Sequence, residues 1–244
     1  MLYLVGLGVW DEKDVSIKGW EAAVKSDSVY AEFYTADWGG SAKGLEKLIG
    51  KRITVIGRSD LEENAGKILG EAKKKDVTVL VPGDPLVATT HMHIILEARK
   101  KRIPVSVIHS SSAYTAIAET GLGIYNFGKT VTIAKPQKGY EPSSFYDAAA
   151  DNRKSGLHTL ILLDTGMDVK GGLEILTRIE AEKRKGLVLP ETGIVAVSRI
   201  GSEEQQIVFG RVRDVIKKEM KPPAMVVIPG RLHFLEKEFL EGFK

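Results

Sequence analysis

The first 108 residues alternate short apolar runs with helical segments, and this alternation limits the possible fold more than any other feature of the chain. Several runs are apolar on both faces rather than at every second position; in the run 77–81, for example, Thr78 is the one polar residue. Strands of this kind are typical of a parallel sheet covered by helices on both faces, so the order of segments predicts an α/β domain. The predicted strands are 2–5, 28–34, 52–55, 77–81 and 105–108, and the predicted helical segments are 14–24, 44–49, 61–74 and 86–101.

The second half of the chain has a different pattern. A polar stretch, His109 to Ser112, suits a linker, and a helical segment follows it from Ala113 to about Glu119. Residues 200–204 suit a hairpin connection, so we expect a mixed or partly antiparallel second sheet. The change of pattern predicts two α/β domains, 1–110 and 111–244, with a cleft between them. The strands predicted for the second domain are 130–134, 160–164, 193–199, 205–209 and 224–228, with a short helix at 212–219.

Composition excludes several classes of protein. The 244 residues include no cysteine, which excludes disulfides, thiolate nucleophiles and Cys-ligated zinc. A net charge of +3, with basic and acidic residues interspersed, gives no indication of nucleic-acid binding. No run approaches the roughly 20 apolar residues of a membrane helix, and the N-terminal run lacks the basic start of a signal peptide. His91 and His93 are two apart in a predicted helix and make a poor metal pair. We therefore expect a cytoplasmic protein without a metal site or membrane span.

Two glycines, Gly6 and Gly8, directly follow the first predicted strand. Glycine lets the backbone turn sharply and approach a ligand closely, but a tight turn alone would also explain the pair. A dinucleotide-binding fingerprint needs a third glycine where Asp11 stands, so NAD binding through that motif is disfavoured.

Gly83, Asp84 and Pro85 follow the fourth predicted strand, at the end where α/β folds bind ligands. Asp84 before Pro85 has the residue types of a helix N-cap. It could equally accept hydrogen bonds from an amine or a ribose. The two roles are compatible, and the sequence leaves both open.

Longer motifs carry a more specific signal. Tyr3-Leu4-Val5-Gly6-Leu7-Gly8, the turn from Gly83-Asp84-Pro85 to Ala88-Thr89-Thr90-His91, and the run from Ile103 to Ser112 resemble successive motifs of the diphthine synthase branch of the tetrapyrrole methylases. Further matches in the same order are Asp14 to Gly19, Tyr125 to Thr130, His158 to Asp164 and Pro229 to His233. Related tetrapyrrole methylases typically have Gly-Pro-Gly-Asp-Pro after the first strand, whereas this chain has Gly8-Val9-Trp10-Asp11-Glu12.

The resemblance implies a homodimeric methyltransferase with S-adenosylmethionine bound in the cleft between the two domains. Its substrate would be translation elongation factor 2, in which a histidine already carries a 3-amino-3-carboxypropyl group. The amino group would be methylated, three times in archaeal members, to give diphthine in diphthamide biosynthesis. No general base is implied. The cofactor contacts carried over onto this chain are Val9, Asp84, Val87, Ser112, Ala113, Leu163, Val208 and His233.

Other interpretations remain at this point. Without the resemblance, Val87, Leu163 and Val208 would pass as ordinary core residues, and His233 as a partly buried polar residue. Within the same fold, a tetrapyrrole methyltransferase of the precorrin or uroporphyrinogen type is the alternative function. A non-catalytic module that binds an adenine nucleotide is the alternative from another class.

Overall fold

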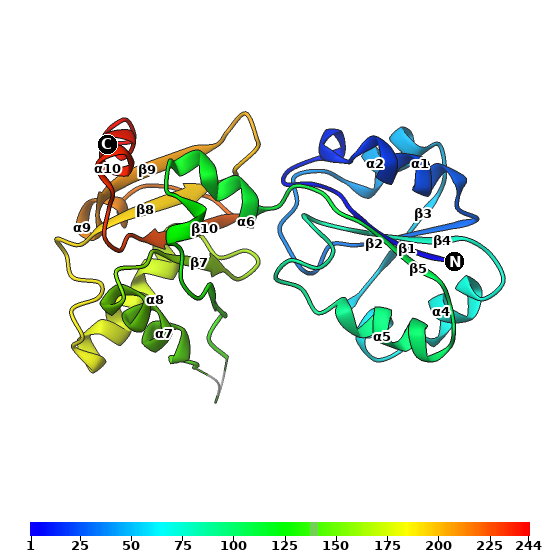
Figure 1. Ribbon diagram of the computed structural model, residues 1–244, viewed down its shortest axis with the longest axis horizontal. Coiled ribbons are helices and arrows are strands. Elements are labelled where there is room, and N and C mark those ends of the chain that lie inside the picture. Colours follow the sequence, from blue (N-terminus) through cyan, green and yellow to red (C-terminus); the bar gives the residue numbers. More distant parts are fainter. Residues whose placement is uncertain (138, 140) are drawn as a thin grey trace. The chain divides into compact units, whose positions relative to one another are not determined.

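The computed structural model describes residues 1–137, 139 and 141–244. The chain divides into two compact units, Met1–Ala116 (unit 1) and Ile117–Lys244 (unit 2), and Figure 1 labels most of their helices and strands. The boundary predicted at residue 110 lies before residues 111–116, which include the short helix α6 (Ala113–Ala116). Unit 1 includes the stretch after residue 108 because Ser110 is hydrogen-bonded to Asp84 of that unit.

Unit 1 is built on a five-stranded sheet in the order β3-β2-β4-β1-β5. All four neighbouring pairs are parallel, which confirms the predicted parallel sheet. The strands are β1 (Leu2–Gly6), β2 (Ser28–Glu32), β3 (Ile53–Ile56), β4 (Val77–Val81) and β5 (Val105–Ile108). β1 and β4 lie inside the sheet, where helices cover both faces, and this is why their residues are largely buried and mostly apolar. The hydroxyl of Thr78 in β4 is hydrogen-bonded to that of Ser26.

The helices of unit 1 pack on the two faces of this sheet (Figure 1). α1 (Ile17–Lys25) and α2 (Ala42–Ile49) share one core with the strands, to which they contribute Ala23 and Leu45. α3 (Arg58–Glu62), α4 (Gly66–Ala72) and α5 (Met92–Lys100) share the other. The 3-10 helix η1 (Glu12–Asp14) precedes α1. The helix predicted at 61–74 is thus two helices.

The start of α5 corrects the sequence prediction. The helix begins at Met92 rather than at residue 86, and turns occupy residues 85–91. Ala88 has a φ of 55°, a left-handed conformation that a continuous α-helix excludes. Asp84 therefore does not cap this helix. Its Oδ1 accepts a hydrogen bond from the backbone N–H of Leu86 at 3.0 Å and closes a short turn instead.

Unit 2 contains a second five-stranded sheet, in the order β6-β7-β10-β8-β9. β6 and β7 are parallel and the other pairs are antiparallel, so the sheet is mixed, as predicted. β8 and β9 form the hairpin expected around residues 200–204. The strands are β6 (Val131–Ile133), β7 (Thr159–Leu163), β8 (Gly193–Ser198), β9 (Gln206–Arg211) and β10 (Ala224–Ile228).

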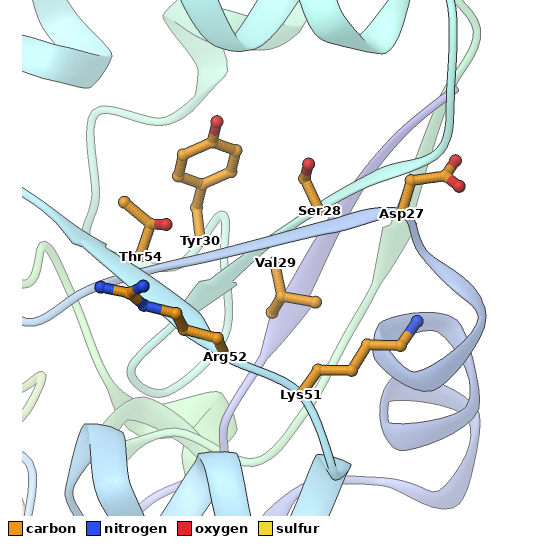
Figure 2. A pocket seen from close by; sticks show the side chains of 7 residues that line it. All are labelled: Asp27, Ser28, Val29, Tyr30, Lys51, Arg52 and Thr54. Atoms are coloured by element: carbon orange, nitrogen blue, oxygen red, sulfur yellow. The ribbon is translucent and has the colours of Figure 1, made fainter.

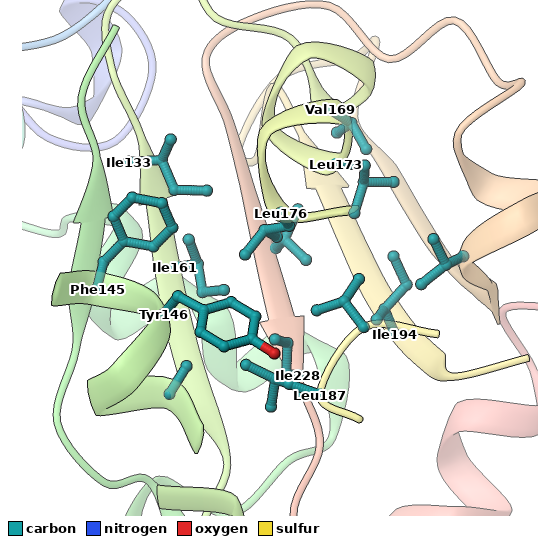
Figure 3. Packing of buried hydrophobic residues seen from close by; sticks show 14 of the residues in the cluster. Ile133, Phe145, Tyr146, Ile161, Val169, Leu173, Leu176, Leu187, Ile194 and Ile228 are labelled. Atoms are coloured by element: carbon teal, nitrogen blue, oxygen red, sulfur yellow. The ribbon is translucent and has the colours of Figure 1, made fainter. Parts of the chain in front are cut away.

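Two helices, α7 (Ser144–Lys154) and α8 (Val169–Lys183), pack on the sheet of unit 2. Figure 3 shows Phe145 and Tyr146 of α7 and Leu173 of α8 among the strand residues of this core. The remaining elements are η2 (Ile117–Thr120), η3 (Ile124–Asn126), α9 (Val212–Val215) and α10 (Phe234–Glu241). In the described part of the chain, no helix has the length and apolar character needed to cross a membrane.

Candidate functional site

Three loops of unit 1 meet at the carboxyl edge of its sheet. β1 lies between β4 and β5, and all three strands run in the same direction, so the loops that follow them leave the sheet side by side. Gly8 and Gly83 form an isolated antiparallel bridge between two of these loops, with N···O distances of 3.2 and 2.9 Å. This is the edge where parallel sheets bind ligands.

The glycines in this corner are required by its geometry. Gly8 and Gly83 have φ values of +86° and +66°, which favour glycine. A Cβ on Gly6 would lie 2.6 Å from the carbonyl oxygen of Gly83 and 2.8 Å from Cβ of Ser110. The glycine pair that the sequence singled out therefore lets all three loops approach one another closely.

The carboxylate of Asp84 joins the loops after β4 and β5. It is buried, and its Oδ2 lies 2.8 Å from Nδ1 of His109 and accepts a hydrogen bond from the backbone N–H of Ser110 at 3.2 Å. The two residues are 25 positions apart in the sequence, so local sequence patterns do not reveal this pair. Strand order could have indicated the pair, because Asp84 follows β4 and His109 follows β5, and both strands are neighbours of β1.

The other cofactor contacts predicted in unit 1 lie in the same loops. Val9 follows β1, Val87 follows Asp84, and Ser112 and Ala113 follow β5; Val9, Val87 and Ala113 are half-buried. Ser112 is buried, and among the described residues its hydroxyl has no hydrogen-bond partner. A buried polar atom without a partner is rare in native proteins and calls for an explanation such as a bound ligand or water.

The three residues predicted in unit 2 come from three different elements. Leu163 ends β7, and its side chain packs against α8, where a Cβ on Gly172 would meet it at 2.6 Å. Val208 lies in β9 and is also packed against the core. β10 and β8 separate these two strands, which places them about 14 Å apart across the sheet. His233 is exposed and caps α10.

A buried carboxylate beside His233 was missed by the sequence analysis. Glu236 accepts hydrogen bonds from the backbone N–H groups of Gly123 and His233, both at 2.8 Å, and from Nδ2 of Asn126 at 3.0 Å. Its Oε1 also lies 3.2 Å from Nε2 of the fully buried His158. The backbone N–H of Gly230 donates to Nδ1 of His158, so the neutral ring carries its proton on Nε2 and donates it to Glu236.

These hydrogen bonds determine the charge of Glu236. Burial alone would raise the pKa of its carboxyl group, but the four donors outweigh burial and lower this pKa to about 2. The ionised carboxylate holds the start of α10, the start of β7 and the segment around Gly123 together, and so fixes the backbone that carries His233.

A surface hollow on unit 1 does not coincide with the predicted site. It has a volume of about 320 Å³ and lies at the amino ends of β2 and β3 (Figure 2). Asp84 follows the carboxyl end of β4, at the opposite ends of the strands. The lining of the hollow includes Lys51, whose ammonium group donates to the carbonyl oxygen of Ser26 at 2.6 Å. None of the predicted contacts lies there. Among the described residues, no group of three or more His, Asp or Glu could hold a metal ion.

Comparison with known proteins agrees with the resemblance stated above. The family model for tetrapyrrole (corrin/porphyrin) methylases matches residues 1–216. The chain belongs to this family. Its members are S-adenosylmethionine-dependent methyltransferases, so the protein is an enzyme of that class.

Similarity to diphthine synthases extends over the whole chain. The diphthine synthase of Methanocaldococcus jannaschii is 41% identical, with 99% of this chain and 98% of the relative covered. That of Methanococcus maripaludis is 42% identical with the same coverage. A crystal structure of a diphthine synthase superposes with a TM-score of 0.89 at 38% identity and covers 99% of this chain and 95% of that one.

Proposed function

We propose that this protein carries out the diphthine synthase reaction. Its substrate would be elongation factor 2 bearing a 3-amino-3-carboxypropyl group on one histidine, and the amino group of that side chain would receive up to three methyl groups. The observation that carries the proposal is the 41–42% identity to diphthine synthases along the full length of both chains. A match confined to the loops around Gly6, Gly8 and Gly83 would support only a methyltransferase of unknown substrate.

The loops of unit 1 fit S-adenosylmethionine. The unpartnered buried hydroxyl of Ser112 and the close approach of the glycine-containing loops at the carboxyl ends of the strands are features of a ligand site. The carboxylate of Asp84 can accept hydrogen bonds from ligand hydroxyl or amino groups. The residues proposed to hold the cofactor are Val9, Asp84, Val87, Ser112 and Ala113 of unit 1 and Leu163, Val208 and His233 of unit 2. When bound, the cofactor supplies a methyl group that its sulfonium makes electrophilic.

The protein's part in this reaction is binding and orientation. Holding an amine in line with a methyl donor removes much of the entropic barrier to transfer. A free α-amino group has a pKa of about 8, so part of the substrate is already deprotonated near neutral pH. The side chain of Leu163 is packed against α8, so we propose that it contacts the cofactor through its backbone. We also propose a cytoplasmic homodimer, and light scattering after gel filtration would measure its mass.

Methyl transfer from labelled S-adenosylmethionine to two substrates in parallel tests the proposed reaction. We expect label in elongation factor 2 that carries the precursor side chain and none in a uroporphyrinogen-type tetrapyrrole. The reverse result would favour the alternative function in the same family. If calorimetry shows binding of adenine nucleotides but none of S-adenosylmethionine, the protein is a nucleotide-binding module and the enzyme proposal is refuted.

A further inference from the structure

The loop between β4 and α5, residues 84–91, carries two of the proposed cofactor contacts, Asp84 and Val87. It contains Ala88 with a φ of 55°. A left-handed conformation is unfavourable for alanine, so neighbouring structure must hold it. Residues in such conformations gather at binding sites, where the loop shape serves the ligand.

The loop is fixed at both ends by buried side chains. At its start, Asp84 contacts His109 and Ser110, as described above. At its end, His91 is 2% exposed, and its backbone N–H donates to Oγ1 of Thr89 at 3.0 Å. The same hydroxyl contacts Nδ1 of the His91 ring. The strained residue therefore lies between two anchors.

The ring of His91 packs beside a buried carboxyl group. Nε2 of His91 lies 3.6 Å from Oε1 of Glu32, the last residue of β2, and both side chains are almost wholly buried. Glu32 accepts hydrogen bonds from the backbone N–H groups of Tyr34 at 2.9 Å and Thr35 at 3.1 Å. The His91 ring thus packs beside the end of β2, the strand next to β4 in the sheet.

Both groups have perturbed acidity. Burial lowers the pKa of His91 to about 4, so the imidazole is neutral at pH 7. Burial raises the pKa of Glu32 above its usual value, against the hydrogen bonds from Thr35 and Tyr34. Other ionisable groups near the pair are Arg58, which lies over the ring of Tyr34, and Glu62, which accepts a hydrogen bond from Thr90.

Stability alone does not account for this arrangement. Apolar residues of the same volume would stabilise the fold about as well as a buried polar pair. Buried ionisable groups of this kind are concentrated at functional sites. Among the described residues, Nε2 of His91 has no hydrogen-bond partner, since 3.6 Å from Glu32 is beyond hydrogen-bond distance.

We propose that His91, held by Thr89 and packed beside Glu32, is a positioning residue for the cofactor site, which holds loop 84–91 in the strained shape that lets Asp84 and Val87 bind S-adenosylmethionine. The inference rests on the function proposed above. It also assigns a role to the Ala88-Thr89-Thr90-His91 motif, for which neither the fold nor the predicted contacts account.

Calorimetric titration with S-adenosylmethionine tests the inference without any protein substrate. We expect His91→Ala to raise Kd about tenfold, because a loop that is competent about one tenth of the time binds correspondingly more weakly. Thr89→Val, which keeps the side-chain shape but removes the hydroxyl, should act in the same direction. His93→Ala is the matched control, because His93 is an exposed histidine two residues further along, in α5, and it should leave Kd within twofold of the wild-type value.

A second substitution separates loop positioning from general damage to the fold. Glycine adopts the left-handed conformation freely, so Ala88→Gly in the His91→Ala background should recover about fivefold in Kd. In methylation assays, KM for S-adenosylmethionine should rise while kcat and KM for the protein substrate stay unchanged. A merely structural defect would lower the amount of active protein and so lower the apparent kcat. It would not raise KM for S-adenosylmethionine selectively, and Ala88→Gly would not restore the Kd.

The outcomes are distinguishable. If the wild-type protein binds S-adenosylmethionine and both Thr89→Val and a folded His91→Ala bind it within twofold of wild type, the inference is overturned. Should His91→Ala fail to fold, Thr89→Val decides alone. Absence of binding by the wild-type protein would refute the proposed function, and this inference with it.

Discussion

Replacing Glu236 by glutamine measures how strongly the hydrogen bonds that converge on this carboxylate hold α10 in place. Glutamine keeps the shape of the side chain, but it loses the charge and places an amide N–H₂ among four donors. The pKa of Glu236 falls from an ordinary 4.5 to about 2, and that difference corresponds to about 3 kcal/mol in favour of the folded state at pH 7. We expect Glu236→Gln to lower the free energy of unfolding by about this amount.

The pH dependence gives a sharper test than the size of the effect. Because the folded-state pKa is depressed, the stabilisation is fully present above pH 4.5, is lost as the pH falls toward 2, and is absent below it. Wild type and Glu236→Gln should therefore differ strongly at pH 7 and converge near pH 2. Glu238→Gln, an exposed glutamate on the same helix, is the control and should behave as wild type at every pH.

Urea unfolding followed by far-UV circular dichroism is the appropriate assay. All three tryptophans, Trp10, Trp20 and Trp38, lie in unit 1, so tryptophan fluorescence reports that unit while dichroism reports both. The reasoning would be refuted by a Glu236→Gln variant that unfolds like wild type at pH 7. A difference of the same size at pH 7 and near pH 2 would refute it equally.

Three further predictions concern single positions. Asp84→Asn should raise the Kd for S-adenosylmethionine at least tenfold in calorimetry, because hydrogen bonds to charged groups contribute about 1.5–3 kcal/mol; an unchanged Kd would show that Asp84 only closes its turn. Gly6→Ala should weaken the same binding and lower Tm, since its Cβ would lie 2.6 Å from the carbonyl oxygen of Gly83; a variant equal to wild type in both would contradict the close approach of the loops. Tyr146→Phe removes the hydroxyl that donates to Glu180 at 2.7 Å, and should cost about 1–2 kcal/mol in urea unfolding while leaving cofactor binding unchanged.

The strands were predictable because burial dictates their composition. The predicted run 77–81 coincides with β4, and 224–228 with β10, since inner strands must be apolar on both faces. The start of α5 was not predictable in the same way. Asp84 and Pro85 have the residue types of a helix cap, and only the observed φ of Ala88 shows that the chain turns away from a helix there.

The candidate site was predictable only in part, for a related reason. The glycine turns are local, so their residue types reveal them. The contacts of Asp84 with His109, of His91 with Glu32 and of Glu236 with His158 each join residues that are distant in the sequence. Sequence periodicity contains no information about such pairs until the strand order is known.

The central claim is that this chain methylates the modified histidine of elongation factor 2, and the mass of that residue tests it most directly. Elongation factor 2 carrying the 3-amino-3-carboxypropyl group would be incubated with the protein and S-adenosylmethionine, digested, and analysed by tandem mass spectrometry. The account predicts that the histidine peptide gains three methyl groups, all on the amino nitrogen of the side chain. A peptide of unchanged mass, or methyl groups located elsewhere in it, would contradict the claim.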